Sequence, residues 1–512
     1  MDLLVGIDLG TSGCKITLIN LEGKIIAKAS GEYTTYHPKP SFSEQNPSDW
    51  FKAMKDCLYE IDCYSGQSGL RNIKAVSLDG STHNAVLLDN KMNVIRPTIM
   101  WNDQRSKSEV EYLENGWGPE IFKIGFQKVA PTWTLPQLLW IKNNEPENFK
   151  RIHKIMFVKD YMRYLLTNSW DTDYIDAQGS LLYDIRGNKW SNDLCSLIDL
   201  PVSVLPPLCQ PSDITGKVTE KAAAETGLPA GIPVICGTSD VIIEDYASGA
   251  NHPGQCILKL ATAGNVNLIT EKPRPDPLTL TYSNVIPGTW LTIVATNSAT
   301  SAMRWFRDVF CTEETNEALQ TGKNIYQIMA QKADAINPGS DGLIFHPYLM
   351  GERSPYWDPS LRASFTGATM AHTKGHFIRA LMEGVGFSLR DCYRIIEKMK
   401  LEVTELIIIG GGAKSDTWSQ IICDIFGKPA VRPAVTDASY GSALLAGVGA
   451  GYFPNITEAV RKCVKMDKIF TPDPDNHIIY GNMFRQYLQI HDNLADTYKG
   501  INNKLTVSKI VL

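Results

Sequence analysis

The chain has 512 residues and a formal net charge of −5, and hydrophobic residues make up 43% of it. This length is ample for two domains, and the lack of net positive charge argues against a nucleic-acid-binding protein. The sequence has no apolar run of about 18 residues and no basic signal-peptide region at its start, so we expect no membrane span and a cytoplasmic location. Its 11 cysteines are scattered without a C-x-x-C pair, which favours reduced thiols over a zinc ribbon or a disulfide framework.

The first predicted element is a β-hairpin over residues 5–19, V-G-I-D-L-G-T-S-G-C-K-I-T-L-I. Its apolar start predicts a buried strand, and its alternating end predicts the returning strand. Between them, Gly10 and Gly13 allow the backbone to come close to a ligand, and the N–H groups of such a turn can bind an anion. The hairpin therefore predicts a phosphate-binding tip, with an ordinary surface hairpin as the alternative.

Four side chains of this hairpin are candidates for binding a metal-bound polyphosphate. Asp8 lies just before the tip, where a carboxylate can hold Mg²⁺, usually through water. Thr11 and Ser12 add hydroxyl donors at the tip itself. Lys15 could reach a phosphate, and a solvated lysine on the hairpin is an equally good interpretation.

Predicted strands and helices alternate through the next part of the chain. Residues 48–61 predict a helix, with Ser48 as its N-cap. Residues 73–78 and 85–88 predict strands, and residues 136–143 and 159–166 predict helices. This alternation is typical of an α/β protein.

Polar residues follow two of the predicted strands, one group around His83 and the other at W-N-D-Q-R, residues 101–105. A sugar needs hydrogen-bonding groups for its hydroxyls and an aromatic or apolar surface for its carbons. The candidate sugar-binding residues are therefore His83, Trp101 and Asn102. The structural alternatives are a loop histidine satisfied by its neighbours and an ion pair between Asp103 and Arg105.

These segments resemble a known family. G-S-T-H-N-A-V-L-L-D, residues 80–89, is similar to a motif of the FGGY carbohydrate kinases, and M-W-N-D-Q-R, residues 100–105, looks like the xylulokinase branch. Residues 131–144 resemble the first signature of the family, although Gln137 replaces the usual lysine. The resemblance implies ATP-dependent phosphorylation of a small sugar, with ATP and Mg²⁺ as cofactors.

The stretch V-I-C-G-T-S-D, residues 234–240, places a carboxylate at the end of a predicted strand. Phosphoryl transfer to a hydroxyl needs a base that accepts the hydroxyl proton, and the resemblance implies that Asp240 is this catalytic base and contacts the sugar. Its structural alternative is an N-cap for the helix expected from about residue 243, worth about 1 kcal/mol. Val241 departs from the polar residue that is common in xylulokinases and cannot donate a hydrogen bond to a sugar, so other ketoses, polyols and sugar acids stay open as substrates.

Residues 259–269, K-L-A-T-A-G-N-V-N-L-I, repeat the layout of the first hairpin, with Thr262 at the tip and Lys259 opposite Asp8. Two hairpins that face each other across a cleft could hold a triphosphate from both sides. The pair resembles the superfamily of sugar kinases, hsp70 and actin. That resemblance implies two ribonuclease-H-like domains that close over ATP.

The later motifs complete the predicted nucleotide site. G-E-R-S-P, residues 351–355, resembles a further family segment, in which Glu352 and Arg353 are expected to form a structural ion pair. L-I-I-I-G-G-G-A-K-S-D, residues 406–416, predicts a strand, a glycine turn and a helix start, without the spacing of a Walker loop or a Rossmann fingerprint. The resemblance implies that this turn packs against adenosine; the residues concerned are Gly411, Gly412 and Ala413, with Asp416 nearby. A tight turn without a ligand is the alternative.

The sequence thus predicts an α/β protein of two actin-like ATPase (ribonuclease-H-like) domains, residues 1–248 and 249–512, around a central ATP and sugar cleft. The expected function is phosphorylation of a ketopentose such as xylulose. A kinase for gluconate, ribulose or a polyol, or a non-catalytic sugar- or ATP-binding regulator, remains an alternative. The expected partners are ATP and a small sugar, without nucleic acid or membrane, and a homodimer is left open.

Overall fold

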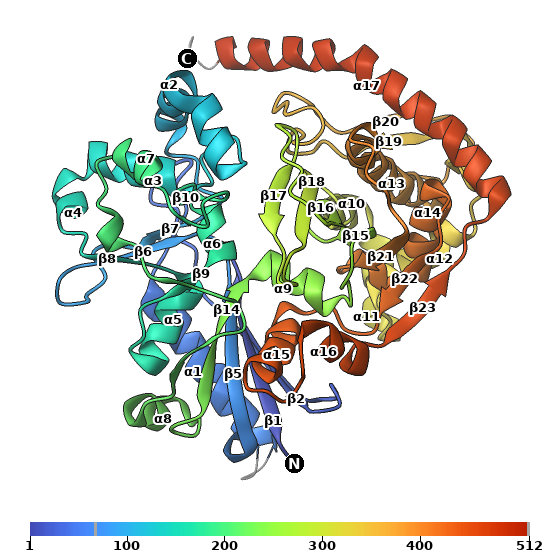
Figure 1. Ribbon diagram of the computed structural model, residues 1–512. Coiled ribbons are helices and arrows are strands. Elements are labelled where there is room, and N and C mark those ends of the chain that lie inside the picture. Colours follow the sequence, from blue (N-terminus) through green and yellow to red (C-terminus); the bar gives the residue numbers. More distant parts are fainter. Residues whose placement is uncertain (66–68, 509–512) are drawn as a thin grey trace.

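The computed structural model describes residues 1–65 and 69–508. The fold has two α/β halves, each built on its own mixed sheet (Figure 1). The sheet of the first half has the strand order β13-β14-β5-β1-β2-β3, and the sheet of the second half has the order β17-β18-β16-β15-β21-β22-β23. None of the helices in the described residues is long and apolar enough to cross a membrane.

The first sheet places the ends of three parallel strands side by side. β1 (Leu3–Leu9) pairs with β5 (Ile73–Gly80), which in turn pairs with β14 (Pro233–Ser239). β1 also forms the predicted hairpin with β2 (Gly13–Asn20), which continues antiparallel into β3 (Ile25–Glu32). β13 (Ile214–Lys217) lies at the other edge, antiparallel to β14.

One face of β1 packs against helices of the first half. Alternate residues such as Leu3, Val5 and Ile7 belong to the same apolar cluster as Trp50 and Met54, on the face covered by α1 (Pro47–Ser65), α5 (Val158–Thr167) and α8 (Glu220–Thr226). This pattern follows from the two-residue repeat of a strand.

Smaller elements build the outer lobe of the first half. Its helices are α2 (Lys107–Gly125), α3 (Thr134–Asn144), α4 (Pro146–Lys150), α6 (Tyr174–Gly179), α7 (Asn192–Ser196) and the 3₁₀ turn η2 (Val202–Val204), while the 3₁₀ turn η1 (Leu70–Asn72) directly precedes β5. Its short paired strands are β4 (Glu44–Gln45) with β7 (Thr98–Ile99), β6 (Ala85–Leu88) with β8 (Lys154–Phe157), β9 (Thr172–Asp173) with β12 (Leu208–Cys209), and β10 (Tyr183–Asp184) with β11 (Lys189–Trp190).

The second sheet repeats the arrangement of the first. β15 (Gln255–Leu260) forms an antiparallel hairpin with β16 (Gly264–Thr270) and lies parallel to β21 (Glu405–Ile409). Lys259 therefore takes the place in β15 that Asp8 takes in β1, as the internal repeat predicts. The remaining strands are β17 (Leu280–Ser283), β18 (Trp290–Thr296), β22 (Ala430–Pro433) and β23 (Met466–Phe470).

Helices surround this second sheet, and the longest of them, α17, curves over the outer side of the molecule (Figure 1). They are α10 (Thr300–Phe310), α11 (Thr312–Thr321), α12 (Ile325–Asp334), α13 (Lys374–Lys398), α14 (Asp416–Phe426), α16 (Ile456–Cys463), α17 (Pro474–Ser508) and the 3₁₀ turns η3 (Ser340–Gly342) and η4 (Gly412–Lys414). A short pair, β19 (Ile344–His346) with β20 (Ser364–Thr366), packs against α13 and α17.

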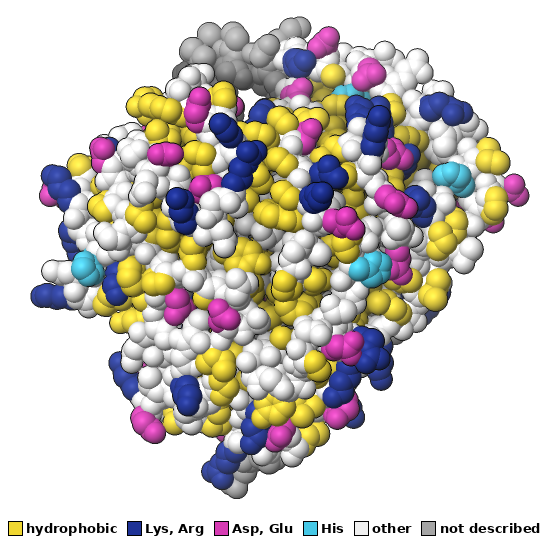
Figure 2. Space-filling view, in the orientation of Figure 1, with side chains coloured by type: hydrophobic (Ala, Val, Ile, Leu, Met, Phe, Trp, Pro, Cys, Tyr) yellow, Lys and Arg dark blue, Asp and Glu magenta, His cyan; other side chains and the backbone are white. Residues whose placement is uncertain are grey.

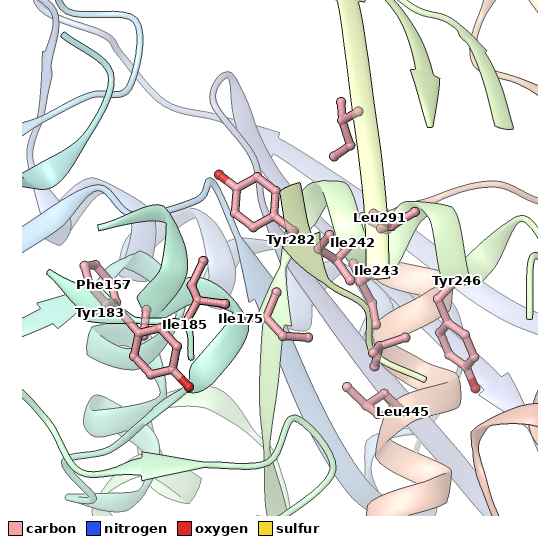
Figure 3. Packing of buried hydrophobic residues seen from close by; sticks show 14 of the residues in the cluster. Phe157, Ile175, Tyr183, Ile185, Ile242, Ile243, Tyr246, Tyr282, Leu291 and Leu445 are labelled. Atoms are coloured by element: carbon pink, nitrogen blue, oxygen red, sulfur yellow. The ribbon is translucent and has the colours of Figure 1, made fainter. Parts of the chain in front are cut away.

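Two helices connect the halves. α9 (Asp240–Ala247) follows the last strand of the first sheet, and α15 (Ala438–Gly449) comes from the second half yet lies on β1, β2 and β5. The small residues of α15 allow this close packing, as the sequence predicts: a Cβ on Gly441 would lie 2.4 Å from the carbonyl oxygen of Ile243, which belongs to α9. Figure 3 shows Ile242, Ile243 and Tyr246 of α9 between Leu445 of α15 and Leu291 of β18, so one apolar cluster spans both halves.

Candidate active site

The carboxyl groups that are candidates for catalysis and metal binding lie at or directly after the ends of β1, β5 and β14. The register pairs Asp8 with Asp79, and Asp79 with Thr238, two residues before Asp240. Asp8 and Asp79 are both buried. Sequence reasoning had singled out Asp8 and Asp240 but missed Asp79, although L-D-G-S-T-H follows a buried strand as I-D-L-G-T-S does.

Burial and mutual repulsion control the protonation of these carboxyl groups. Burial, helped by the negative charge of Asp240, raises the pKa of Asp8 to about 7, while Lys15 and a hydrogen bond with Asp79 act in the opposite direction. Burial and then the charge of Asp8 hold the pKa of Asp79 well above its usual range. A cation placed here would favour the ionised carboxylates.

The carboxyl oxygens at this point fit a magnesium ion. Oδ1 of Asp8 and Oδ1 of Asp79 are buried and have no hydrogen-bond partner within residues 1–65 and 69–508. Mg²⁺ prefers oxygen ligands and is held by one or two carboxylates together with substrate phosphates. The donor set is therefore suited to a Mg²⁺–nucleotide complex, with Asp8 next to the tip of the first hairpin.

Asp240 is the first residue of α9, and the N-cap position belongs to Ser239. The structural alternative, in which Asp240 is the N-cap of this helix, is therefore wrong, because the N-cap lies one residue earlier in the chain. Its Oδ1 accepts hydrogen bonds from the Thr82 hydroxyl (3.1 Å) and from the N–H of Val241 (2.8 Å). Burial raises the pKa of Asp240, and the positive charge of Lys259 is the largest opposing influence.

A backbone hydrogen bond and a side chain from another segment fix the tip of the first hairpin. The N–H of Gly10 donates to the carbonyl of Gly13 (3.1 Å) and closes the turn. Thr11 accepts a hydrogen bond on its hydroxyl from the indole of Trp101 (2.9 Å). Ser12 is exposed, and Lys15 lies 3.9 Å from Asp437 with more than half of its side chain exposed.

His83 is a buried and neutral histidine. Its backbone is in the left-handed region (φ +51°), and its N–H and carbonyl are held by Asp176 (2.8 Å) and Thr134 (2.6 Å). The ring packs 5.1 Å from that of Trp133. Burial lowers the pKa of His83 to about 3. Nδ1 is buried without a partner in the part of the chain that the structure describes, so this nitrogen is suited to a ligand hydroxyl.

The residues of the polar group at 101–105 have different neighbours in the structure. Trp101 is hydrogen-bonded to Thr11 of the first hairpin, and Asn102 lines a cavity of about 550 Å³ with the 37–43 loop and Gln104. The ion pair predicted between Asp103 and Arg105 is confirmed (2.8 Å). It is buried and continues to Glu44 (2.7 Å).

β17, in the second half, is hydrogen-bonded to the first half. The side-chain amide of Gln178 exchanges hydrogen bonds with the N–H (2.8 Å) and the hydroxyl (2.7 Å) of Ser283, and Gln127 donates to the carbonyl of Thr281 (2.7 Å). Between these contacts, burial and the charges of Asp176 and Asp240 hold the pKa of Tyr282 above its usual range. Tyr282, from the second half, therefore interacts with these two acids of the first half, and no local sequence signal pointed to it.

The second hairpin and the glycine turn lie together. The carbonyl of Thr262 accepts hydrogen bonds from Ala299 (3.0 Å) and the Ser301 hydroxyl (2.8 Å), at the start of α10. A Cβ on Gly412 would lie 2.9 Å from the Cβ of Leu260, so the turn packs directly on β15.

The glycine turn has an open side. A Cβ on Gly411 would meet no atom within 4 Å in the described residues, and Ala413, in η4, is buried. Asp416 forms ion pairs with Arg432 (2.8 Å) and Lys468 (2.6 Å), and the hydrogen bond from Lys468 lowers its pKa. Its carboxylate is thus committed to protein cations at the rim of the turn.

Glu352 and Arg353 do not form the expected ion pair. Glu352 instead accepts hydrogen bonds from the N–H groups of Asn297 and Arg353 (2.7 Å each) and from the Thr296 hydroxyl (2.5 Å). The buried carboxyl therefore fixes the segment that leads from β18 into α10. Its role in the structure is to position backbone.

Comparisons with known proteins agree with this architecture. The models for the N-terminal and C-terminal domains of the FGGY family of carbohydrate kinases match residues 3–244 and 259–450. The xylulose kinase of Bacillus subtilis is 33% identical, over 97% of this chain and 98% of its own. Among solved structures, the xylulose kinase of Rhodospirillum rubrum (27% identical, 97% and 100% covered) has a TM-score of 0.88, and the gluconate kinase of Lactobacillus acidophilus (26%, 98% and 99%) one of 0.87.

Proposed function

The chain belongs to the FGGY family of carbohydrate kinases, and we propose that it transfers the γ-phosphoryl group of ATP to a hydroxyl of D-xylulose or a closely related ketopentose. The observation that carries the proposal is the pair of carboxyl groups at neighbouring strand ends. Asp8 lies beside the tip of the first hairpin, and Asp240 accepts a hydrogen bond from Thr82, the residue before the buried His83. One carboxylate is thus suited to the metal and the other to the acceptor hydroxyl.

In this proposal, Asp240 is the general base. It accepts the proton of the sugar hydroxyl as the bond to phosphorus forms. The Thr82 hydroxyl and the N–H of Val241 hold one carboxylate oxygen in place. The base therefore keeps a fixed orientation toward the acceptor, which is what proximity catalysis requires.

The nucleotide is held from both halves. Thr11, Ser12 and Lys15 on the first hairpin and Thr262 on the second contact the phosphates in this proposal, while the turn of Gly411, Gly412 and Ala413 supports adenosine, with Asp416 at its rim. Asp8, and Asp79 beside it, would hold Mg²⁺. When bound, this ion neutralises charge on the β- and γ-phosphates. We place the boundary between the two domains near residue 248.

The identity of the sugar substrate is the part of the proposal that has an alternative. His83, Trp101 and Asn102 are the candidate sugar-side residues, and the name of the Bacillus subtilis relative supports xylulose. Val241, next to the base, favours a second candidate, because it cannot donate a side-chain hydrogen bond to a sugar hydroxyl. A sugar acid is that candidate, since a gluconokinase of Bacillus subtilis is 28% identical over 97% of this chain.

The test is ADP release with Mg-ATP against a panel of ketoses, polyols and sugar acids, with Asp240→Asn measured beside the wild type. We expect a sugar-dependent rate that falls by about 10²–10⁴-fold in the variant, while Mg-ATP still raises the melting temperature of both proteins. A sugar acid that gives the highest kcat/KM would overturn the choice of xylulose. Sugar binding without ADP release from either protein would favour a non-catalytic regulator.

A further inference from the structure

Lys259 is a partly buried cation at the junction of the two halves. Its strand register places it opposite Asn265 of β16 and Ile409 of β21, as Asp8 lies opposite Lys15 and Asp79. Its side chain is 17% exposed. The same position of the repeated hairpin thus carries a carboxylate in the first half and an ammonium group in the second.

The second hairpin holds the helix that begins with Asp240. The ammonium group of Lys259 donates a hydrogen bond to Glu244, and the amide of Asn267 donates one to Asp245 (2.8 Å). Glu244 follows Asp240 by four residues in α9, so the two carboxyl groups lie on the same face of the helix, with Cβ atoms about 5–6 Å apart. The hydrogen bond between Lys259 and Glu244 therefore brings the ammonium group of Lys259 close to Asp240.

Several titratable groups interact with Asp240. They come from β1, from the residue after β3, from β5, from β17 and from its own helix, and they are Asp8, Tyr33, Asp79, Tyr282 and Glu244. The negative charge of Glu244 raises the pKa of Asp240. Among the groups whose charges act most on Asp240 in the described residues, Lys259 supplies the positive charge. A positive charge within a few ångströms favours the ionised form of a carboxyl group.

We propose that Lys259 is a positioning residue for the phosphoryl transfer: held by Glu244, its ammonium group keeps Asp240 as the carboxylate that accepts the sugar proton. The inference rests on the proposed role of Asp240 as the base. In a purely structural role, Lys259 would only neutralise Glu244. The two roles differ in whether the protonation state of Asp240 depends on Lys259.

A double-mutant cycle on stability tests the interaction without any catalysis. Melting temperatures would be measured at pH 7 for the wild type, Lys259→Met, Asp240→Asn and the double variant. We expect Lys259→Met to lower the melting temperature, and the loss to be at least halved when Asp240 is already Asn, because the shared attraction is then absent. An equal loss in both backgrounds would overturn the inference, whatever sugar the enzyme uses.

Asp199→Asn is the matched control for the cycle. Asp199 pairs with Lys142 (2.5 Å) and is largely exposed, so its combination with Lys259→Met should be additive. A non-additive result for this pair would mean that the Asp240 coupling reflects a general change of the fold, and would also overturn the inference.

The pH profile of kcat tests the consequence for the base, with the best sugar of the panel. We expect Lys259→Met to move the acidic limb to higher pH by about one unit and Lys259→Arg to restore it. Rescue by arginine, which keeps the positive charge, distinguishes the electrostatic role from a disrupted structure. An acidic limb that does not move in Lys259→Met, or an Arg variant no better than Met, would refute the role.

Discussion

The hydroxyl of Ser442 donates a hydrogen bond of 2.5 Å to Oδ2 of Asp79, across a sequence separation of 363 residues. Ser442 belongs to α15, from the second half of the chain, and Asp79 is the last residue but one of β5, the strand between β1 and β14. This bond fixes the orientation of the Asp79 carboxyl group. The cleft is therefore assembled by both ends of the chain.

Ser442→Ala should destabilise the protein by about 1–3 kcal/mol, because it leaves a buried carboxyl oxygen of Asp79 without its donor. Urea unfolding at constant pH would measure the change. Ser108→Ala serves as the control: this serine is exposed on α2, so its removal should cost less than about 0.5 kcal/mol. Equal effects of the two substitutions would show that the hydrogen bond to Asp79 contributes nothing.

Gly6→Ala should prevent normal packing of α15. A Cβ at this position would lie 1.8 Å from the backbone carbonyl oxygen of Ser439 and 2.3 Å from the backbone N of Ala443, and overpacking against backbone costs about 1–3 kcal/mol or more. Soluble yield and melting temperature would both fall. Gly116→Ala is the control, because its Cβ would meet nothing within 4 Å in the described structure and alanine is the better helix former. A Gly6→Ala variant as stable as Gly116→Ala would contradict the close packing of α15 on β1.

His83→Asn should weaken sugar binding while leaving ATP binding intact. Asparagine tolerates the left-handed backbone of this position, so the loop should keep its shape, but the ring and its Nδ1 are lost. In steady-state kinetics we expect KM for the sugar to rise by about tenfold, corresponding to about 1.4 kcal/mol, and KM for ATP to stay within about twofold. A rise confined to KM for ATP would move His83 out of the sugar site.

Glu352 should make the protein less stable as the pH rises. Burial raises the pKa of its carboxyl from 4.5 to about 7, so between these values the folded state binds more protons than the unfolded state, and the free energy of unfolding falls with increasing pH. The effect is absent below about pH 4.5, is complete above about pH 7, and amounts to a few kcal/mol at most.

Glu352→Gln isolates this contribution. The difference in free energy of unfolding between wild type and variant, measured by urea denaturation from pH 4.5 to 8, should change in favour of the variant as the pH rises. A difference that is constant across this range would mean that the carboxyl group titrates normally. The neutral histidines His83 and His346, whose pKa values burial lowers, cancel in this comparison because both proteins contain them.

Local patterns were sufficient to predict much of the fold. The two hairpins, the strand before Asp240 and the small-residue helix each have a signal within about 15 residues, because glycine turns and strand alternation are local properties. The internal repeat also placed Lys259 opposite Asp8, and the structure has the same correspondence.

The content of the cleft was less predictable because its contacts are distant in sequence. Trp101 and His83 lie 18 residues apart and were grouped together, yet Trp101 contacts Thr11 and His83 contacts Asp176 and Thr134. Glu352 and its neighbouring arginine were paired because they are adjacent, whereas burial directs the carboxylate to backbone N–H groups. Tyr282 carries no motif and reaches the cleft through the position of β17 alone.

The packing of α15 has a consequence for biosynthesis. Leu4, Ile19 and Ala75, on one face of the first sheet, share a buried cluster with Leu444 of α15. A ribosome that has made only the first 248 residues has therefore produced a sheet with an uncovered apolar face, and the helix that covers it is translated nearly 200 residues later. The nascent first half must stay soluble through that interval, so shortened chains that end before residue 438 are expected to be targets for chaperones and proteases.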